Sequence, residues 1–351
     1  MQRILVTGGA GFIGSAVVRR LVGKGRHVVT LDKLTYAGNL SSLKAVAASP
    51  NHRFVQGDIA DRALVSNLLR EERIEAVMHL AAESHVDRSI DGPAEFVQTN
   101  VVGTCGLLDA ALEYWRELDM PRREAFRFHH VSTDEVFGDL PFDGSPFSEE
   151  TPYAPRSPYA ASKAASDHFV RAWHATYGFP IVLSNCANNY GPYQFPEKLI
   201  PLAVLNALEG KAIPIYGSGL NIRDWIYIDD HAAALEAVLT RGSVGTSYNV
   251  GARQERTNLA VVEAICERLD AKVPRGDGRS YSELIAMVAD RPGHDRRYAI
   301  EPTRIERELG WRPEVGFARG LEMTVDWYLD NQWWWAPIRS GKNAGERVGF
   351  G

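Results

Sequence analysis

The sequence predicts an α/β fold: a Rossmann-like, doubly wound parallel sheet followed by a smaller, mixed α/β C-terminal lobe. Two observations lead to this prediction. Apolar runs of strand length alternate with helical apolar spacing from residue 3 to about residue 190, and this alternation is typical of a parallel sheet with helices on both faces. In addition, glycine-rich, hydroxyl and acidic segments directly follow the strands, and the carboxyl ends of parallel strands are where such sheets bind ligands.

Each element is predicted from its own apolar pattern. Continuous apolar runs such as residues 3–7 (RILVT) and 27–31 (HVVTL) are typical of strands buried on both faces. Segments in which apolar residues recur every three or four positions, such as residues 12–22, predict helices. Strands are expected at residues 3–7, 27–31, 76–80, 126–132 and 181–185, and helices at residues 12–22, 63–72, 96–114 and 159–177.

The character of the chain changes after about residue 190, where proline becomes frequent and short strands and helices mix. We therefore expect residues 1–190 to form a nucleotide-binding domain that carries the catalytic residues, and residues 191–335 to form mainly a substrate-binding lobe. Part of residues 222–250 is expected to return to the first domain. We expect residues 336–351 to form a loose tail. The three tryptophans Trp333-Trp334-Trp335 are expected to anchor the C-terminal segment against the body of the protein, in preference to forming a binding platform.

Composition narrows the class of protein. The chain has 351 residues, 45% of them hydrophobic and 24% charged, which is ordinary for a globular protein. A net charge of −5 argues against nucleic-acid binding, which needs a dense basic surface. The three cysteines are far apart and predict neither a disulfide framework nor a metal site. No run is long and apolar enough for a membrane span, and Met1 leads directly into a strand, so a cytoplasmic location is expected.

The first motif is a glycine-rich turn between the first strand and the first helix. Gly8, Gly11 and Gly14 allow a tight turn, close approach of backbone to a pyrophosphate, and close packing of helix on strand. The amides of Phe12 and Ile13 open the helix, so its N-terminus would face the phosphates. This context predicts a dinucleotide-binding site.

The second strand ends in a carboxylate that favours one cofactor. Asp32 follows Gly14 by 18 residues and can accept hydrogen bonds from ribose hydroxyls. A 2′-phosphate would meet like charge there, so Asp32 favours NAD over NADP, although Lys33 weakens the argument. Asp58 is open to two interpretations, a helix N-cap or a contact at the rim of the adenine site.

The second motif places five proton-handling or polar groups near the expected nicotinamide. Thr133, Asp134 and Glu135 follow a strand, and Tyr159 and Lys163 are spaced i, i+4 on one helix face. A tyrosine base near neutral pH needs its pKa lowered by about 3 units, which a lysine in a partly desolvated cleft beside oxidised nicotinamide can supply.

The paired carboxylates predict more than hydride transfer. If a sugar is oxidised at C4, the C5 proton becomes acidic and the C6 hydroxyl becomes a leaving group. Glu135 could then take the C5 proton while Asp134 protonates the departing hydroxyl. A 4-epimerase would need Tyr159 and Lys163 but not this pair, and a protein that merely binds NAD would need none of these groups.

These motifs resemble the extended short-chain dehydrogenases/reductases, and within them the dTDP-glucose 4,6-dehydratase family. The resemblance runs from about residue 2 to 335. One small departure is Phe137, where the family commonly has tyrosine. The matching stretches are residues 32–40, 79–89, 132–136, 188–193, 195–201, 223–225 and 290–298.

The resemblance implies an NAD-dependent nucleotide-sugar dehydratase that keeps NAD tightly bound and regenerates it in each turnover. It also implies dTDP-glucose as substrate, and a homodimer built on the helix near 100–114 and the helix of Tyr159. The implied catalytic residues are Thr133, Asp134, Glu135, Tyr159 and Lys163. The implied NAD contacts are Gly8, Gly11, Phe12, Ile13, Gly14, Asp32, Lys33, Leu34, Thr35, Asp58, Ile59, Leu80, Ala81, Ala82, Ser84, Thr99, Tyr159, Lys163 and Asn189. The implied substrate contacts are Ser84, Thr133, Asn188, Lys198, Leu199, Pro214, Ile215, Tyr216, Arg223, Asn258, Asp290, Arg291 and His294.

Charge supports part of the substrate site without the resemblance. A nucleoside diphosphate carries about two negative charges, which Lys198, Arg223 and Arg291 could neutralise, and arginine offers a planar fork to phosphate oxygens. For Lys198 alone, an ordinary surface cation is a reasonable interpretation, and for Arg223, which lies between apolar runs, that interpretation is weaker. A related nucleotide-sugar 4,6-dehydratase or a 4-epimerase of the same fold remains the alternative function.

Overall fold

The computed structural model describes residues 1–341 and shows a seven-stranded parallel sheet, as the alternating pattern predicts. Its strand order is β10-β6-β5-β4-β1-β2-β3, which reverses direction beside β1 and so creates the crevice in which such sheets bind ligands. The strands are β1 (Arg3–Thr7), β2 (His27–Asp32), β3 (His52–Gln56), β4 (Ala76–His79), β5 (Arg127–Thr133), β6 (Ile181–Cys186) and β10 (Ser247–Val250).

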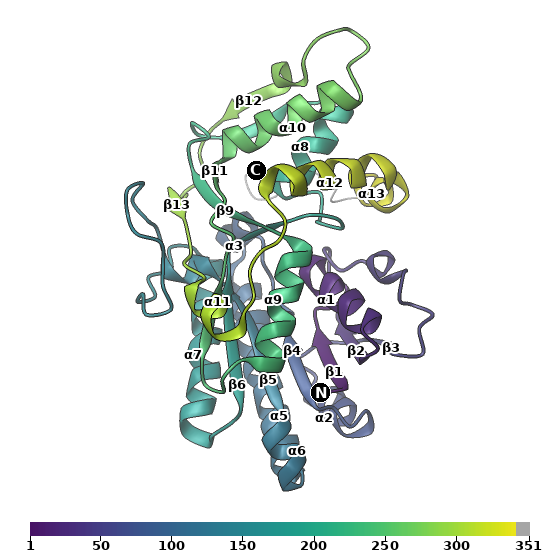
Figure 1. Cartoon of the computed structure of the whole chain (residues 1–351), viewed down its shortest axis with the longest axis vertical. Coiled ribbons are helices and arrows are strands. Elements are labelled where there is room, and N and C mark those ends of the chain that lie inside the picture. Colours follow the sequence, from purple (N-terminus) through teal and green to yellow (C-terminus); the bar gives the residue numbers. More distant parts are fainter. Residues whose placement is uncertain (342–351) are drawn as a thin grey trace.

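Helices cover both faces of this sheet (Figure 1). Alternate residues of a strand point to opposite faces, so Ile4 and Val6 join the core under α1 and α9, whereas Leu5 joins the core under α2 and α5. The helices of this lobe are α1 (Phe12–Gly23), α2 (Arg62–Glu71), α3 (Val86–Asp91), α4 (Pro93–Phe96), α5 (Thr104–Glu117), α6 (Met120–Ala125), α7 (Pro158–Tyr177) and α9 (Ile228–Arg241), with 3₁₀ turns at Leu40–Leu43 and Asp134–Phe137.

A smaller lobe with two short sheets lies beyond the carboxyl ends of the central strands (Figure 1). Its helices α8 and α10 pack on each other, and α12 contacts both. Its strands are β7 (Asn188–Tyr190), β8 (Ile213–Tyr216), β9 (Ile222–Tyr227), β11 (Glu255–Thr257), β12 (Ile285–Val288) and β13 (Arg297–Tyr298). Its helices are α8 (Leu199–Leu208), α10 (Asn258–Lys272), α12 (Phe317–Asp330) and α13 (Gln332–Arg339), with a 3₁₀ turn at Tyr281–Leu284. Helix α11 (Thr303–Leu309) instead packs on α9 and β10 of the first lobe (Figure 1).

The chain crosses between the lobes more than once. In the segment 222–250, β9 pairs with β7, β11 and β13 in the smaller lobe, whereas β10 pairs with β6 at the edge of the central sheet. Helix α9 between them packs on α1 and on β5 and β6.

The helix predicted at 96–114 is not one regular α-helix. It is made of α4, a π-helical segment at Val97–Gly103, and α5. Within the π segment, the Asn100 side chain accepts from Glu83 N at 2.8 Å and donates to Glu83 O at 3.0 Å. The helix wall is therefore bonded to the loop after β4, and π turns are frequent next to functional sites.

The prediction of a loose tail from residue 336 is wrong for its first residues, because α13 continues to Arg339. The helix is fixed by buried contacts: the Trp334 indole donates to Ser42 Oγ at 3.1 Å and the Trp335 indole to Tyr328 O at 2.7 Å. Trp334 is 2% exposed and Trp333 is 45% exposed. The remainder of the predicted tail, residues 342–351, lies outside the described residues.

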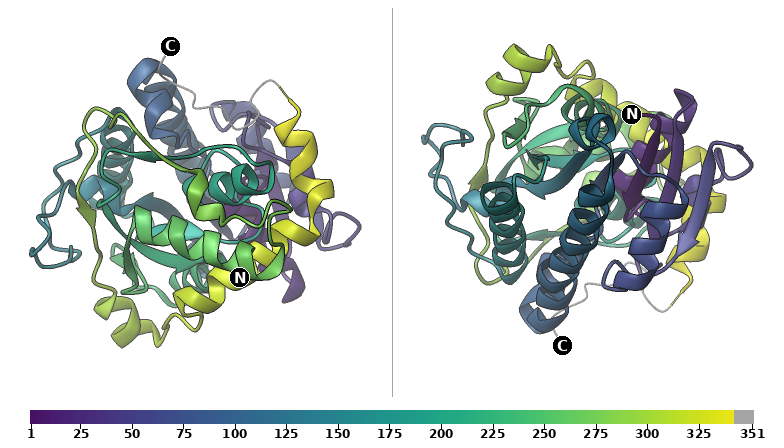
Figure 2. Two further views of the ribbon diagram at one scale, coloured as in Figure 1. Left: turned by 90° about the horizontal axis from the view of Figure 1, so that it is seen from above. Right: turned by 90° about the horizontal axis from the view of Figure 1, so that it is seen from below.

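Two further views place the C-terminal helices α12 and α13 beside the N-terminal elements (Figure 2). Seen from below, α5 and α7 run side by side along one face. Over residues 1–341, no helix combines the length and apolarity needed to cross a membrane.

Candidate active site

The glycine turn after β1 forms a cradle with no room for side chains. Gly8 has φ +70°, in the left-handed region that favours glycine. A Cβ placed on Gly14 would lie 2.1 Å from Gly8 O, inside contact distance. Gly11 caps α1 without a side-chain hydrogen bond, so the amides of the first turn stay open toward the cleft. A pyrophosphate fits this arrangement.

Asp32 is fixed at the end of β2 beside this cradle. Its Oδ2 accepts from Ala10 N at 2.9 Å and its Oδ1 accepts from Leu34 N at 2.8 Å. Burial raises the pKa of Asp32, and the two amides oppose that shift. Lys33 pairs with Asp58 at 2.7 Å, and both residues line the same cleft. The N-cap of α2 is Asp61, so Asp58 is left at the rim.

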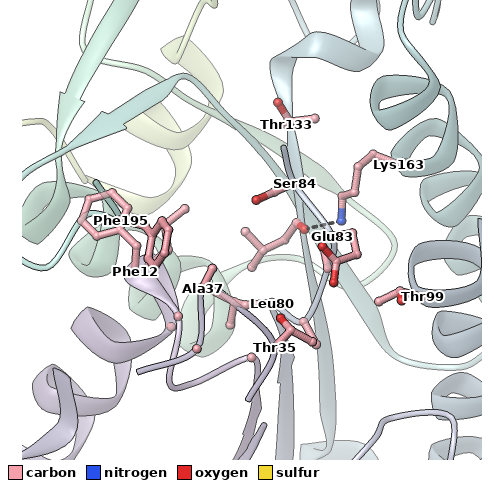
Figure 3. A pocket seen from close by; sticks show the side chains of 18 of the residues that line it. Phe12, Thr35, Ala37, Leu80, Glu83, Ser84, Thr99, Thr133, Lys163 and Phe195 are labelled. Atoms are coloured by element: carbon pink, nitrogen blue, oxygen red, sulfur yellow. Dashed lines mark hydrogen bonds between the residues drawn. The ribbon is translucent and has the colours of Figure 1, made fainter. Parts of the chain in front are cut away.

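One cleft joins the glycine cradle to the predicted catalytic residues (Figure 3). Figure 3 shows Thr133 and Lys163 on one side of it and Phe12 and Phe195 on the other. The predicted site residues that line this cleft are Gly8, Gly11, Phe12, Ile13, Gly14, Asp32, Lys33, Thr35, Asp58, Ile59, Leu80, Ala81, Ala82, Ser84, Thr99, Thr133, Asp134, Glu135, Tyr159, Lys163, Asn188, Asn189 and Lys198.

Tyr159 and Lys163 reach the cleft from the first turns of α7. The helix begins there because Ser157 caps it, accepting from Ala160 N at 3.1 Å, and Pro158 occupies its first position. Lys163 Nζ donates to Val131 O at 2.9 Å (the dashed line in Figure 3). Burial lowers the pKa of Lys163 and raises that of Tyr159 well above its usual value. In the protein alone, Tyr159 is therefore a neutral phenol, and a positive charge in the cleft is needed to make it a base.

The paired carboxylates lie on the 3₁₀ turn after β5. Thr133 caps this turn, and its hydroxyl accepts from Glu135 N at 3.3 Å. Asp134 Oδ2 is buried and has no hydrogen-bond partner among the described residues. Burial, with the nearby Glu135, raises the pKa of Asp134 well above its ordinary value. The protonated form of Asp134 is therefore favoured.

Three cations face the second carboxylate. Burial raises the pKa of Glu135, whereas Arg291, Arg223 and Lys198 pull it down. Arg223 is 5% exposed and lies over the Tyr298 ring at 4.3 Å. These three cations give a positive potential beside the 3₁₀ turn that carries Glu135.

Several predicted substrate residues lie outside the cleft lining, in the smaller lobe around this cationic cluster. Tyr216 donates to Asp87 Oδ2 at 2.9 Å, and Asp87 also pairs with Arg291 at 3.4 Å. His294 pairs with Asp290 at 2.7 Å. Residues not in the cleft lining are Leu34, Leu199, Pro214, Ile215, Tyr216, Arg223, Asn258, Asp290, Arg291 and His294. Of these, Leu34 packs on the apolar core, Leu199 and Asn258 begin α8 and α10, and Pro214 to Tyr216 lie in β8.

Some lining residues were not identified from the sequence. Phe195 and Glu197 cover the cleft, and Tyr36 OH donates to Glu197 Oε1 at 3.1 Å, so this loop touches the segment after β2. The sequence could have indicated Phe195 and Glu197, because both lie in residues 195–201, one of the stretches that resemble the family. Gln194 and Cys186 carried no recognisable signal, because an amide and a thiol at these positions look like ordinary core residues.

The chain is similar to known proteins over nearly its whole length. The chain matches the family described as GDP-mannose 4,6 dehydratase over residues 5–324. It is 56% identical to the dTDP-glucose 4,6-dehydratase of Neisseria meningitidis serogroup B over 100% of both chains. It is also 56% identical to dTDP-glucose 4,6-dehydratase 1 of Escherichia coli K12, over 97% of this chain and 96% of the other.

Solved structures show the same fold. DesIV, a dTDP-glucose 4,6-dehydratase of Streptomyces venezuelae solved with NAD bound, aligns with a TM-score of 0.87 at 46% identity, covering 96% of this chain and 99% of that one. The UDP-glucose 4-epimerase of Thermus thermophilus, also with NAD, aligns with a TM-score of 0.81 at 31% identity, covering 94% and 99%. The chain thus belongs to the nucleotide-sugar dehydratases of the extended short-chain dehydrogenase/reductase fold, within the dTDP-glucose 4,6-dehydratase family.

Proposed function

We propose that the protein oxidises dTDP-glucose at C4, eliminates water across C5 and C6, and returns hydride to C6, giving dTDP-4-keto-6-deoxy-glucose. The observation that carries the proposal is the position of Asp134 and Glu135 in the same cleft as Tyr159 and Lys163. The glycine cradle and Asp32 fit NAD. When bound, NAD would supply reversible hydride transfer and, in its oxidised form, a positive charge in the cleft that Tyr159 lines.

Tyr159, Lys163 and Thr133 handle the C4 oxygen. Tyr159 takes the hydroxyl proton as a phenolate, which Lys163 and the cationic nicotinamide stabilise against the burial that otherwise keeps the phenol neutral. Lys163 is held in place by Val131 O. Thr133, at the end of β5, is placed to hydrogen-bond the C4 oxygen.

Asp134 and Glu135 carry out the elimination. Glu135 removes the C5 proton, and the cations around it favour its charged form. Asp134, which keeps its proton because it is buried, gives that proton to the departing C6 hydroxyl. Lys198, Arg223 and Arg291 supply the charge that a nucleoside diphosphate needs.

The test is incubation of purified protein with dTDP-glucose deuterated at C4, with no added NAD, followed by NMR of the product. A 4-keto-6-deoxy sugar with deuterium at C6 is expected. Inversion at C4 with retained label would show an epimerase instead. Reaction only with UDP- or GDP-sugars would contradict the substrate assignment.

A variant separates the two chemical stages. Glu135→Gln should retain some C4 oxidation but lose most elimination, because the amide cannot take the C5 proton. Acid–base assistance of this kind is worth about 10²–10⁴-fold. Oxidation is followed by cofactor absorbance and elimination by product NMR. Equal loss of both stages in a folded, NAD-loaded variant would contradict the role of Glu135.

We infer that the protein is a homodimer located in the cytoplasm. Support for the dimer comes from exposed apolar side chains on two adjoining helical segments: Val97 and Val102 are 50% and 47% exposed, and Phe169 and Tyr177 on α7 are 38% and 43% exposed. A reducing compartment suits the three free cysteines, Cys105, Cys186 and Cys266.

A further inference from the structure

We propose that Asp167, a buried carboxylate one helical turn beyond Lys163, is the counter-ion that keeps Lys163 in its ammonium form, and that it acts as a positioning residue for the chemistry at Tyr159. The inference rests on the proposed function for its catalytic consequence, but the pairing itself is argued from geometry and charge.

Lys163 and Asp167 contact two consecutive residues of β5, Val131 and Ser132. Tyr159, Lys163 and Asp167 are spaced i, i+4, i+8 and so share one face of α7. Lys163 Nζ donates to Val131 O at 2.9 Å, and the next residue, Ser132, donates its hydroxyl to Asp167 Oδ2 at 2.8 Å. Lys163 is 5% exposed and Asp167 is 0% exposed, so neither charge is screened by solvent.

Asp167 is bonded as a carboxylate. Besides Ser132, it accepts from His130 Nε2 at 3.0 Å, from Tyr153 OH at 2.8 Å and from Asn185 Nδ2 at 3.4 Å. Burial alone would raise its pKa, but the hydrogen bonds from His130 and Tyr153 and the positive charge of Lys163 outweigh burial and hold the pKa of Asp167 below its ordinary value. Protonation would turn one acceptor position into a donor, so four surrounding donors favour the ionised carboxylate.

These donors satisfy the carboxylate without cancelling its charge. Ser132, Tyr153 and Asn185 donate as neutral groups. Burial lowers the pKa of His130 to about 4, so its imidazole is neutral near pH 7. His79, whose ring lies 5.3 Å from that of His130, is also held neutral by burial, which lowers its pKa well below the usual value.

Among the groups near Lys163 that raise its pKa, Asp167 is the one that carries a negative charge. Burial lowers the pKa of Lys163, and Asp167 and Cys186 are the groups that raise it. Cys186 on β6 is a neutral thiol, because burial raises its pKa to about 12. Arg171, one turn further along α7, donates to Tyr153 OH at 2.9 Å and lies over the Tyr153 ring at 4.8 Å.

The pair explains how a lysine can stay charged in a dry site. An isolated buried ammonium gives up its proton, whereas one beside a fixed carboxylate keeps it. Because the Tyr159 phenolate depends on the Lys163 charge, the carboxylate acts on the reaction without touching the substrate.

The first experiment is the pH profile of kcat for the NAD-loaded Asp167→Asn variant between pH 6 and pH 10. Loss of the carboxylate should move the alkaline limb, where Lys163 loses its proton, to lower pH by at least about one unit. The value of kcat at pH 8 should fall about tenfold or more, and KM should stay within about twofold, because one pKa unit corresponds to a tenfold change in protonation. Asp167→Glu should restore part of the shift.

Two variants serve as controls because they keep the carboxylate. Ser132→Ala and Tyr153→Phe each remove one donor to Asp167, so they should lower stability but leave the alkaline limb in place. An Asp167→Asn profile that superposes on the wild-type profile, or control variants that move the limb equally, would overturn the proposal.

A stability cycle tests the pair even if Asp167→Asn folds poorly or the substrate assignment fails. Lys163→Met leaves Asp167 as an uncompensated buried charge, so urea unfolding should show a clear loss of stability. Adding Asp167→Asn to Lys163→Met should recover part of that loss, whereas Asp167→Asn in the wild-type background should destabilise. Additive effects would overturn the pairing. Wild-type turnover of dTDP-glucose, measured separately, tests the proposed function.

Discussion

Asp134 shows most clearly how a single residue is tuned in this cleft. Its carboxyl is 1% exposed, its Oδ2 lacks a hydrogen-bond partner within the described chain, and Glu135 adds a neighbouring negative charge. Each factor favours the protonated form. The burial, the unpaired oxygen and the neighbouring charge that favour a protonated Asp134 also lower the stability of the fold when Asp134 is ionised. The pH dependence of unfolding can measure this cost.

Asp134→Asn should increase stability while removing elimination. A carboxyl whose pKa is raised on folding contributes stability that is present at low pH and is lost as pH rises from about 4 toward the folded-state pKa. The amide does not titrate, so the variant should match wild type near pH 4 and exceed it increasingly toward pH 8. Thermal unfolding of both proteins across this range measures the difference. A constant difference at all pH values would contradict the raised pKa.

The glycine cradle offers a matched pair of substitutions on α1. Gly14→Ala places a methyl group 2.1 Å from Gly8 O, so it should cost about 1–3 kcal/mol and release bound NAD. Gly23→Ala meets nothing within 4 Å and should stabilise by about 0.4–1 kcal/mol with NAD retained. Urea unfolding and cofactor content after gel filtration separate the two. Full NAD content in Gly14→Ala would argue against the cradle.

At the scale of elements, α13 fixes the segment that follows the cofactor loop. Trp334 is buried and bonded to Ser42, in the 3₁₀ turn just after residues 32–38, and Trp327 packs against it at 5.3 Å. Trp333, its neighbour, is half exposed and lies over Lys44 at 4.8 Å.

Trp334→Ala should therefore cost about 3–5 kcal/mol, because it leaves a large cavity between α13 and the first lobe. Trp333→Ala removes only a surface cation–π contact and should cost about 0.5–1 kcal/mol. Equilibrium urea unfolding of the two variants provides the comparison. Similar costs would mean that α13 is not an anchor.

The sequence was most informative where local pattern determines structure. The strands through Ile181–Cys186 and the turn of Gly8, Gly11 and Gly14 follow from periodicity and glycine spacing, and the structure agrees. The π segment at Val97–Gly103 could not be predicted, because its cause includes the long-range bond between Asn100 and Glu83. The role inferred for Asp167 likewise depends on four donors brought together from distant positions.

For the whole molecule, the property to test is the proposed homodimer. Val102→Glu places a charge on the exposed apolar face beside α5 and should convert a homodimer to monomers, because a buried unpaired charge opposes association. Met287→Glu, at a 54% exposed site in the smaller lobe, is the control and should leave the assembly unchanged. Sedimentation equilibrium gives the mass of each. A monomeric wild type, or equal behaviour of both variants, would contradict the proposed dimer.

The interleaved order of the sheet has a consequence for how the protein is made. One edge strand of the central sheet, β10, is encoded after β9 of the smaller lobe, and Trp334 donates a hydrogen bond to Ser42, 292 residues earlier in the chain. A ribosome must therefore translate the chain through Trp334 before the cofactor lobe can reach its final packing. The two lobes cannot mature one after the other as independent domains do, so a prematurely terminated product should emerge without a competent nucleotide pocket.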